Sequence, residues 1–567
     1  MEMTNVIDSK DIADAFNNFF TDVGTRLAQG IPPVDDSPMS FMRNSTLNSF
    51  YIKRVTSEEV SEEIDKLNPS KSTGPYSIPT NILILIKDLI SSPLEQIFNL
   101  SFETGIVPEK FKVTNVIPVH KKGSDLCVTN YRPISLLSVF NKLLEKLMFL
   151  RLMSFLNKNN ILFHKQFGFR QHHSTLQAVL SIADKIQTSI DSSSYSCGIF
   201  LDLSKAFDTV NHKFLLDKLF FYGIRGIALE WFKSYLCNRK QFVSIGNSNS
   251  DIKPIPMGVP QGSVIGPLLF LLYLNDLPNC SDVLDFHLFA DDTNLFFSSK
   301  SLLDIESTAK NELGYVHKWL CCNQLSLNIE KSNYVIFHAP QKKITFPVHL
   351  SLNNCLLKQE SATKYLGVLI DENLNWKSHV SLIESKIKRG VGVISRLRHT
   401  VTKRILLNLY YSLIHPYLTY GLVAWGNTYN TTLQPLLNLQ KKVIRLMTFS
   451  QFREHSDPLF YELNILKIND LIKFQTANFM YDYHHGNLPD VFNTYFTHAS
   501  TKHKYNTRFS SKENYSLPHV KTNYGKFNVR FAGAILWNSL EDNLKKEKKK
   551  NFKSKLFLKL IKTYNSC

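Results

Sequence analysis

Two short stretches, FLDLSKAFDTVNH (200–212) and LFADDTNLF (288–296), decide the fold class of this chain. In each stretch a run of apolar residues ends on aspartate, at Asp202 in the first and at Asp291 and Asp292 in the second. Short apolar runs bounded by turn residues are typical of buried strands. We therefore predict a strand that ends at Asp202 and a hairpin with the acidic pair at its tip, although each aspartate alone is more often a cap or an acidic β-turn.

Carboxylates at the ends of buried strands need positive charge close to them. An ionised carboxylate taken out of water is costly unless it is paired, and two adjacent carboxylates repel each other. Mg²⁺ relieves both problems, because it prefers oxygen ligands and is held by a few carboxylates together with substrate phosphates. Asp202, Asp291 and Asp292 are therefore predicted to hold two Mg²⁺ ions for in-line phosphoryl transfer, and Mn²⁺ accepts the same ligands.

A glycine- and proline-rich loop separates the two acidic stretches. The sequence MGVPQGSVIGPLLFLLYLNDL (257–277) places a tight loop before an apolar helix. Glycine lets the backbone approach a ligand closely, and the amide of Gln261 offers both a donor and an acceptor. A ligand-contacting loop and a plain turn before a core helix are equally compatible with this pattern.

The composition is that of a globular protein with several cores. The chain has 567 residues, of which 43% are hydrophobic and 20% are charged, and this excludes disordered, collagenous and low-complexity classes. The apolar run Pro267–Leu274 is far shorter than the roughly 20 residues that a membrane-spanning helix needs, so we expect no membrane partner. The eight cysteines show no C-x-x-C pair and no zinc-site spacing, and we interpret them as reduced thiols in an intracellular protein.

The positive charge is concentrated in the C-terminal third. The net charge of the whole chain is +18, from 66 basic and 48 acidic residues. Residues 381–567 hold 29 of the basic and 11 of the acidic residues, and this excess accounts for the whole net charge. A long basic segment is the electrostatic footprint of a nucleic-acid binder, and a basic surface kept for solubility is the alternative.

The periodicity of the apolar residues changes along the chain. A helix over residues 1–28 precedes a Pro- and Ser-rich linker, and helical stretches then alternate with short apolar runs, which favours α/β or α+β architecture around a sheet. Residues 380–480 are helical almost throughout, whereas residues 500–535 are poorly periodic.

Nine sequence blocks follow one another along the chain: GPYSIP (74–79), VIPVHKKGS (116–124), NYRPISLLS (130–138), QFGFRQHHST (166–175), FLDLSKAFDTVNH (200–212), GVPQGSVIGPLLF (258–270), FADD (289–292), NQLSLNIEKS (323–332) and KYLGVLID (364–371). In this order they resemble the reverse transcriptases of non-LTR (LINE-type) retrotransposons, most of all those of the jockey and CR1 group. The resemblance implies an α/β (α+β) right-hand polymerase fold in four parts. These are an N-terminal helix and linker in residues 1–50, fingers and palm in 51–370, a helical thumb in 371–450 and a basic C-terminal region in 451–567.

The resemblance implies a role for each residue at the nucleotide site. The carboxylates of Asp202, Asp291 and Asp292 would form the metal-binding catalytic triad of the palm, and Phe207 would be the steric gate that excludes a ribose 2′-hydroxyl. Lys331 would donate a proton to pyrophosphate, and an ordinary surface lysine is the alternative. Lysine and arginine suit a triphosphate because they are the usual phosphate ligands. The residues implied to contact the incoming dNTP are Lys121 or Lys122, Arg132, Phe207, Gln261 and Lys331.

The resemblance also implies contacts to the primer and to the template–primer duplex. Tyr365, Leu366 and Gly367 would form the primer grip, although the first two would fit a hairpin core as well. The QFGFRQHHST block interleaves basic groups with rings, which suits a single-stranded template because its bases stack and its phosphates need charge. A basic helical thumb would follow the backbone of an A-form duplex. The predicted template and duplex contacts are Arg170, Lys386, Lys388, Arg389, Arg396 and Arg398.

Three features depart from the family pattern or add to it. Tyr76 stands in GPYSIP where relatives usually carry aspartate. We expect the chain to lack the N-terminal endonuclease of full-length relatives, a C-terminal zinc knuckle and an RNase H carboxylate set. The KKEKKK cluster (545–550) is predicted to be a nuclear localisation signal or a phosphate-binding patch, with a solvated helix end as the alternative. We expect a mainly nuclear location, with part of the protein in a cytoplasmic RNA–protein complex.

The predicted function is an RNA-directed DNA polymerase that extends a primer 3′-hydroxyl on an RNA template, with target-primed reverse transcription as its setting. Its expected partners are the RNA template, the DNA primer or target and dNTPs, with two Mg²⁺ or Mn²⁺ ions as cofactors. A palm-fold RNA-dependent RNA polymerase is the nearest enzymatic alternative, and Phe207 and Ala290 argue against it. The alternative from another class is a catalytically silent nucleic-acid-binding remnant of such an element, which the intact acidic triad disfavours.

Overall fold

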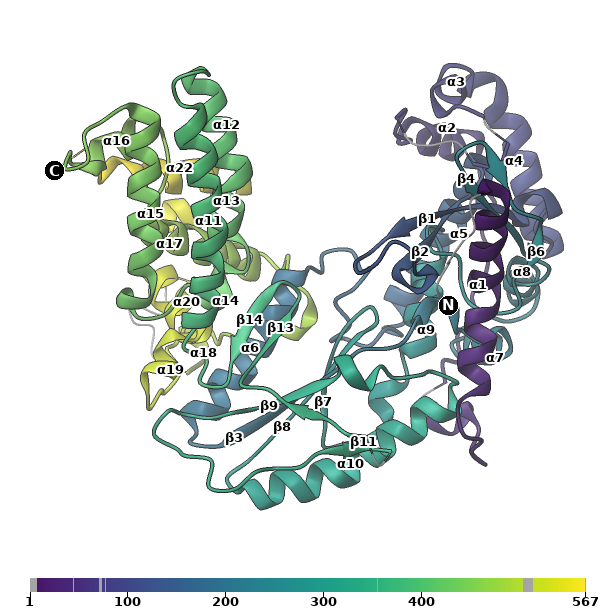
Figure 1. Cartoon of the computed structure of the whole chain (residues 1–567), viewed down its shortest axis with the longest axis horizontal. Coiled ribbons are helices and arrows are strands. Elements are labelled where there is room, and N and C mark those ends of the chain that lie inside the picture. Colours follow the sequence, from purple (N-terminus) through teal and green to yellow (C-terminus); the bar gives the residue numbers. More distant parts are fainter. Residues whose placement is uncertain are drawn as a thin grey trace.

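The computed structural model describes residues 8–565 except 44, 71–73, 77, 354 and 503–512, and its elements form two columns that rise from a shared base (Figure 1). The right-hand column carries the N-terminal helices, the left-hand column carries the helices after residue 376, and a β-sheet lies at the base. Two residues named above lie outside the described residues: Ser77, in the GPYSIP block, and the C-terminal Cys567. The seven described cysteines form no disulfide, and no described helix has the length and hydrophobicity to cross a membrane.

The base is a five-stranded sheet in the order β12–β9–β3–β8–β7. Its central strand β3 (Tyr195–Leu201) is buried along its whole length and pairs antiparallel with both neighbours. Ile199 lies in one hydrophobic core and Phe200 in another, because successive side chains of a strand point to opposite faces. The other strands are β12 (Lys358–Gln359), β9 (Asn333–Phe337), β8 (Asp292–Ser299) and β7 (Asp285–Phe289).

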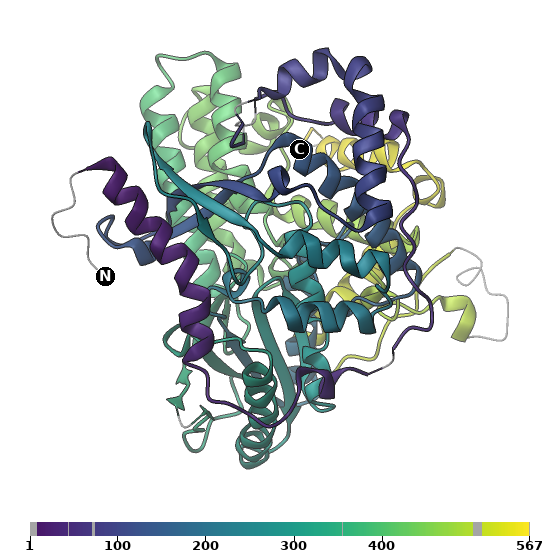
Figure 2. The same ribbon diagram turned by 90° about the vertical axis from the view of Figure 1, so that its right-hand side faces the viewer.

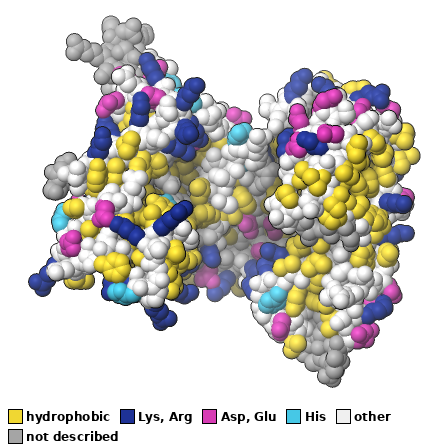
Figure 3. Space-filling view, turned by 90° about the horizontal axis from the view of Figure 1, so that it is seen from above, with side chains coloured by type: hydrophobic (Ala, Val, Ile, Leu, Met, Phe, Trp, Pro, Cys, Tyr) yellow, Lys and Arg dark blue, Asp and Glu magenta, His cyan; other side chains and the backbone are white. Residues whose placement is uncertain are grey.

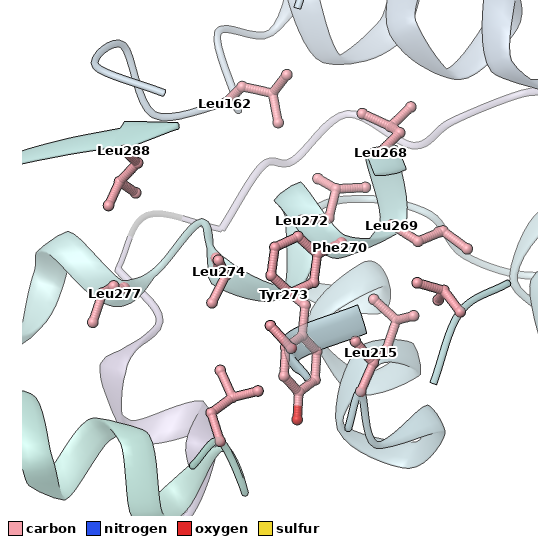
Figure 4. Packing of buried hydrophobic residues seen from close by; sticks show 14 of the residues in the cluster. Leu162, Leu215, Leu268, Leu269, Phe270, Leu272, Tyr273, Leu274, Leu277 and Leu288 are labelled. Atoms are coloured by element: carbon pink, nitrogen blue, oxygen red, sulfur yellow. The ribbon is translucent and has the colours of Figure 1, made fainter. Parts of the chain in front are cut away.

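Helix α9 (Gly266–Leu274) lies at the centre of the first core. Eight of its nine residues are buried, and a helix that is apolar on every side is stable only when neighbours surround it. Figure 4 shows Phe270 and Tyr273 of α9 packed among side chains from other elements, including Leu215 of α7 (His212–Phe221). The other helices around this core include α5 (Val139–Lys158), α8 (Ile227–Leu236) and α10 (Leu302–Cys322).

A second sheet, with the strand order β2–β1–β4–β5 and β6 paired to β4, belongs to the right-hand column. Helix α1 (Ser9–Gln29) lies beside this sheet (Figure 2), and the ring of Phe16 meets that of Tyr131 edge-on at a centroid distance of 4.8 Å. The predicted N-terminal helix is therefore part of this lobe. The other elements here are α2 (Ser57–Asp65), α3 (Thr80–Leu85), α4 (Lys87–Thr104), β1 (Val113–His120), β2 (Tyr131–Leu136), β4 (Lys240–Ile245), β5 (Ser248–Asn249) and β6 (Lys253–Pro254).

The helices of the left-hand column share one core with the base sheet. This core joins Phe200 and Phe296 of the sheet to Trp425 and to Trp537 near the C-terminus. The segment 500–535 was predicted to be poorly periodic, whereas its described part contains α19 and α20. The longer helices of this column are α11 (Lys377–Leu397), α12 (Lys403–Leu413), α15 (Asn430–Thr448), α17 (Ile468–His484), α20 (Val529–Asn538) and α22 (Lys549–Lys562), and the shorter ones are α13 (His415–Thr419), α14 (Leu422–Trp425), α16 (Ser456–Glu462), α18 (Ala499–Lys502), α19 (Asn523–Phe527) and α21 (Asp542–Lys545).

Two aspartates of helix α6 (Thr175–Asp191) hold the C-terminal segment against the base. Arg530 donates to both carboxylate oxygens of Asp184, from Nε at 2.7 Å and from Nη2 at 2.8 Å. Asp191 accepts hydrogen bonds from the backbone N and the side-chain Oγ1 of Thr522, each at 2.7 Å. The C-terminal segment therefore belongs to the folded body. The mixed α/β class is confirmed, whereas the four-part division of the chain stays a prediction.

Candidate active site

The predicted acidic residues meet at one end of the base sheet. Asp202 follows directly after β3, and Asp291 and Asp292 lie where β7 turns into β8. Leu201 pairs with Thr293 across β3 and β8, so Asp202, one position after Leu201, and Asp292, one position before Thr293, lie opposite each other at the same end of the sheet. The antiparallel register thus brings together carboxylates that are about ninety positions apart in the sequence.

The turn between β7 and β8 that carries Asp291 and Asp292, here called the acidic turn, is hydrogen-bonded to the loop that contains QFGFR. The side-chain oxygen Oε1 of Gln166 accepts hydrogen bonds from the backbone N of Ala290 at 3.0 Å and of Gly168 at 2.8 Å. Ala290 has a φ of 55°, a left-handed conformation that is strained for a residue with a side chain. A Cβ on Gly168 would lie 2.4 Å from the backbone N of Ala290, so only glycine fits there. Sequence reasoning gave this loop a template role and missed its support of the acidic turn.

The two aspartates at the tip of the β7–β8 hairpin have raised pKa values. Burial, followed by the charges of Asp291 and Asp202, raises the pKa of Asp292 to about 6. Burial and the charge of Asp202 also raise the pKa of Asp291, and Lys121 and Arg132 oppose that rise. Such a cluster of negative charge is short of counter-charge, and added positive charge would stabilise its ionised form.

The donor atoms fit a hard divalent cation in kind, but they do not form a complete ligand set by themselves. Lys331 Nζ lies 3.2 Å from Asp202 Oδ2 and forms an ion pair with it. In the described part of the chain, no three His, Cys, Asp or Glu side chains are arranged to ligate one ion. Carboxylate oxygens short of counter-charge suit Mg²⁺, which commonly takes its remaining ligands from substrate phosphates and water.

Cations of the second sheet face these carboxylates. Lys121 follows β1, and its backbone N donates to Asn130 O at 2.8 Å, while Arg132 lies on β2 opposite Val119 of β1. Partial burial and the charges of Arg132 and Lys331 lower the pKa of Lys121, and the charge of Asp202 raises it. Lys121 and Arg132 are therefore close enough to Asp202 and Asp291 for their charges to interact. Lys122 has an exposed side chain.

Phe207 lies in the short 3₁₀ helix Ala206–Asp208 that follows Asp202. Its ring stacks on that of Phe270 with a centroid distance of 4.3 Å and an interplanar angle of 25°. Phe169 approaches the same ring edge-on at 6.1 Å. The stack on α9 fixes the orientation of the Phe207 ring, which is half-buried.

Gln261 is anchored at both its backbone and its side chain. Its carbonyl oxygen accepts from the backbone N of Ser135 in β2 at 2.7 Å, and its Nε2 donates to Asp208 Oδ1 at 2.8 Å. Gly262 has a φ of 128°, and a Cβ there would lie 2.5 Å from Ser135 O, so the loop requires glycine at that position. Asp208 was not identified from the sequence, because an aspartate after Phe207 carries no signal that it contacts a loop fifty residues away.

The predicted primer-grip residues form a tight hairpin. Strand β13 (Ala362–Tyr365) turns into β14 (Val368–Asp371) through Leu366 and Gly367, which have φ values of 43° and 87°. Tyr420 Oη donates to Leu366 O at 2.6 Å and ties the turn to the helices of the left-hand column. Tyr365 is buried in the core, as its hairpin alternative predicted.

The side chains predicted to contact the duplex differ in whether they already interact with other groups of the protein. Arg170 Nη1 donates to Phe163 O at 2.9 Å, so this guanidinium supports its own loop. Lys388 pairs with Glu384 at 2.8 Å, Lys386 Nζ lies 5.1 Å from the Tyr417 ring centroid, and Arg398 Nε donates to His399. Figure 3 shows Lys and Arg side chains along the hollow between the two lobes. Arg389 and Arg396 are exposed on α11, and all six contacts stay predictions.

Comparison with known proteins bears on this site. Residues 119–370 match the family model described as reverse transcriptase (RNA-dependent DNA polymerase). The RNA-directed DNA polymerase from mobile element jockey of Drosophila melanogaster is 30% identical over 446 residues, which are 76% of this chain and 48% of that protein. The probable RNA-directed DNA polymerases from transposon BS and transposon X-element of the same species are 29% and 28% identical, over 76% and 74% of this chain and 49% and 47% of their own lengths. The chain thus spans about half the length of the curated relatives it matches.

Proposed function

Residues 119–370 of this chain are a reverse transcriptase domain, and from that premise we propose that the chain is an RNA-directed DNA polymerase of a non-LTR retrotransposon. It would extend a primer 3′-hydroxyl on an RNA template with dNTPs as substrates. The observation that carries the proposal is the position of three carboxylates at one end of the sheet. Lys121, which follows β1, and Arg132 of β2 oppose the rise in the pKa of Asp291. Phosphoryl transfer depends mainly on positioning and charge, and both are supplied by this arrangement.

The chain's own residues would divide the work between binding and selection. Lys121, Arg132 and the neighbouring Lys122 would bind the triphosphate, since positive charge is worth most where it meets phosphate in a partly dry cleft. The Phe207 ring, fixed by its stack on Phe270, would close the space beside the sugar against a 2′-hydroxyl. Lys331 would hold a proton near the leaving phosphates, and its contact with Asp202 keeps it at the site.

Asp202, Asp291 and Asp292 would hold the divalent cations, with substrate phosphates completing the ligand set. Bound there, Mg²⁺ or Mn²⁺ in a two-ion arrangement supplies positive charge that stabilises the attacking and leaving oxygens. The raised pKa values of the two hairpin carboxylates support this role, because a cation would compensate the charge that crowds them.

The wider setting follows from this proposal. Target-primed reverse transcription would use a DNA 3′-hydroxyl at the target as primer and the element's RNA as template. A nuclear location suits a DNA target, with an RNA–protein complex in the cytoplasm as an earlier stage. The cluster 545–550 would contribute to import only through its exposed lysines, because Lys545 itself is buried.

Primer extension tests the proposal. Purified protein is given poly-rA/oligo-dT with Mg²⁺ and either dTTP or UTP, and Asp291→Asn serves as the inactive variant. We expect extension with dTTP alone, its loss in Asp291→Asn, and nearly equal duplex affinity for both proteins. The matched control is Asp217→Asn, which removes an exposed aspartate on α7. Preference for UTP, or no extension by folded protein that binds the duplex, would overturn the proposal.

A further inference from the structure

Two phenylalanine rings are exposed together at one end of the left-hand column. Phe449 follows directly after α15 and is 56% exposed, and Phe452 in the next loop is 83% exposed. Helices α12 and α16, which begin close to these residues, lie at the upper end of the column (Figure 1). Neighbouring large apolar side chains on a surface mark an interaction site more often than a single exposed ring does.

The backbone at Phe449 is strained. Its φ of 58° and ψ of 22° are left-handed, a conformation that commonly ends a helix but usually belongs to glycine or asparagine. Its backbone N donates to Arg445 O, which closes the end of α15. Core packing does not explain the aromatic side chain, because more than half of the residue is exposed. Strain of this kind is often found where a residue serves a function.

Five arginines lie on the loops after α11 and α15 and on the helix ends beside them. The guanidinium of Arg398 lies 5.8 Å from the centroid of the Phe449 ring, and the His399 ring lies 5.4 Å from it, so the two loops are side by side. Arg445 donates from Nε at 2.9 Å and from Nη2 at 2.7 Å to Glu454 O, which is a neutral carbonyl. The five, none of which pairs with a carboxylate in the part of the chain that the structure describes, are Arg396, Arg398, Arg404, Arg445 and Arg453.

The carboxylates that are close in sequence already interact with other groups. Glu462 pairs with Lys403, and Glu454 Oε2 accepts a hydrogen bond from the backbone N of Gln451 at 3.1 Å. Figure 3, which looks down on this end of the column, shows hydrophobic side chains and Lys or Arg side chains together on the left-hand lobe. The surface therefore offers aromatic rings and uncompensated positive charge at the same place.

Unpaired nucleotides match this combination. Their bases have flat faces that stack on aromatic rings, and their phosphates bind arginine. Bases inside a duplex already stack on one another, so a duplex would occupy the arginines and leave the two rings unused. A single strand uses both kinds of side chain.

We propose that Phe449, Phe452 and the five arginines, here called the ring–arginine site, bind unpaired RNA outside the template–primer duplex. Phe449 and Phe452 would each stack on a base, while the arginines bind the flanking phosphates. The inference rests on the proposed polymerase function, because copying leaves the part of the RNA that has not yet been paired single-stranded. A displaced DNA strand has the same bases and phosphates, and the experiment below separates the two.

The ring–arginine site is distant from the residues predicted to grip the primer. Helix α11 starts shortly after β14 and ends beside the site, and its 21 residues span about 30 Å at the usual rise of an α-helix. RNA bound at the site would therefore be held at a second place, apart from the end of the primer.

Binding of labelled oligo-rU to the full chain without dNTPs tests the inference. The double variant Phe449→Asn/Phe452→Ala removes both rings, and asparagine tolerates the left-handed conformation at position 449. We expect the affinity for oligo-rU to fall about thirtyfold, the lower end for two lost base–ring stacks, while the affinity for a blunt RNA–DNA duplex stays the same. The matched control is Phe220→Ala, which removes an exposed ring on α7.

The salt dependence of binding tests the arginines. Replacing Arg453 with glutamine should lower the slope of log affinity against log salt by about 0.7, the value for one phosphate contact on a single strand. Lys310→Gln, which removes an exposed charge on α10, should leave the slope unchanged. An unchanged slope for Arg453→Gln would remove this residue from the site.

The other outcomes are equally definite. Unchanged oligo-rU affinity in the double variant would overturn the inference and leave the rings as a contact for another protein, and an equal loss for the blunt duplex would overturn it as well. A loss confined to oligo-dU would assign the site to a displaced DNA strand and overturn the assignment to RNA. If the double variant does not fold, Phe452→Ala alone should show about a tenfold loss.

Stability and catalysis provide separate readouts. A merely structural role of the rings predicts a lower melting temperature for the double variant, whereas relief of the strain at position 449 should preserve or raise it. Protein that binds oligo-rU but does not incorporate dTTP would count against the proposed function. Protein that incorporates dTTP but binds oligo-rU equally with and without the rings would count against the ring–arginine site.

Discussion

Lys331 Nζ lies 3.2 Å from Asp202 Oδ2, although 129 positions separate the two residues in the sequence. The contact is supported by the backbone, because Asn328 N donates to Asp202 O at 2.8 Å and Asp202 N donates to Ser332 Oγ at 3.2 Å. The loop that carries Lys331 is therefore attached to the strand end that carries the carboxylate. This cation is therefore part of the acidic site.

Replacing Lys331 with glutamine should slow catalysis with little effect on stability. Both partners of the ion pair are well exposed, and exposed pairs contribute about 0–1 kcal/mol to the free energy of unfolding. A proton donor to the leaving group contributes about a hundredfold or more to the rate. Single-turnover incorporation of dTTP measures the effect, with Lys310→Gln on α10 as an exposed control. Equal rates for Lys331→Gln and the unsubstituted protein would leave Lys331 as a surface lysine.

Replacing Phe207 with valine should admit ribonucleotides. The smaller side chain opens the space beside the sugar, and it also loses the stack on Phe270. We expect the preference for dTTP over UTP to fall by about tenfold to a hundredfold, the range for a change in shape at an apolar contact. The ratio of the two kcat/KM values measures it, and Phe220→Val removes an exposed ring as the control. If the ratio stays constant, Phe207 is a packing residue only.

Replacing Arg530 with methionine should destabilise the protein. Asp184 is 7% exposed in its side chain, and the substitution leaves that charge without its partner. We expect the free energy of unfolding to fall by about 3 kcal/mol, the lower end of the range for a broken buried pair, because the arginine is partly exposed. Denaturant unfolding measures it, and Arg26→Met removes an exposed pair as the control. The double variant with Asp184→Asn should recover much of the loss, and a failure to do so would contradict the pairing.

His379 should make the protein less stable in acid. Burial, and then the charge of Lys386, lowers the pKa of His379 to about 4, below the usual 6.5. The unfolded chain therefore takes up a proton between these two pH values while the folded state does not, so stability falls as the pH drops through this window. Protonation of His379 is expected to lower the free energy of unfolding by roughly 3 kcal/mol across this window. Unfolding at pH 7 and pH 4 measures it, and His379→Gln should show a smaller loss than the exposed control His399→Gln.

The acidic site could be predicted from the sequence because its parts are local. A short apolar run that ends on Asp202, and two runs that flank Asp291 and Asp292, already describe a strand end and a hairpin tip. The alternative of a hairpin core for Tyr365 and Leu366 agrees with the β13–β14 hairpin, in which Tyr365 is buried. In each of these cases the chemistry and the local geometry lie within about ten residues.

The remaining features depend on contacts between distant segments. Nothing near Asp208 indicates that it binds Gln261, and nothing near Gln166 indicates that it holds the acidic turn. Helices α19 and α20 were missed because they are short and gain their stability from packing on α6 and α17. Ion pairs such as Lys388–Glu384 also reduced the free charge of the predicted duplex surface, which a count of basic residues overstates.

The attachment of the C-terminal segment to α6 has a consequence for handling this protein in the laboratory. Asp184, Asp191 and the apolar face of α6 meet residues 520–530 in place of water. A shortened version that stops before this segment would expose the apolar surface of α6 to water. Poor expression of such a version would therefore say nothing about nucleic-acid affinity. Point changes on the surface of α11 are therefore the sound way to study duplex binding, and tags are better placed beyond α22.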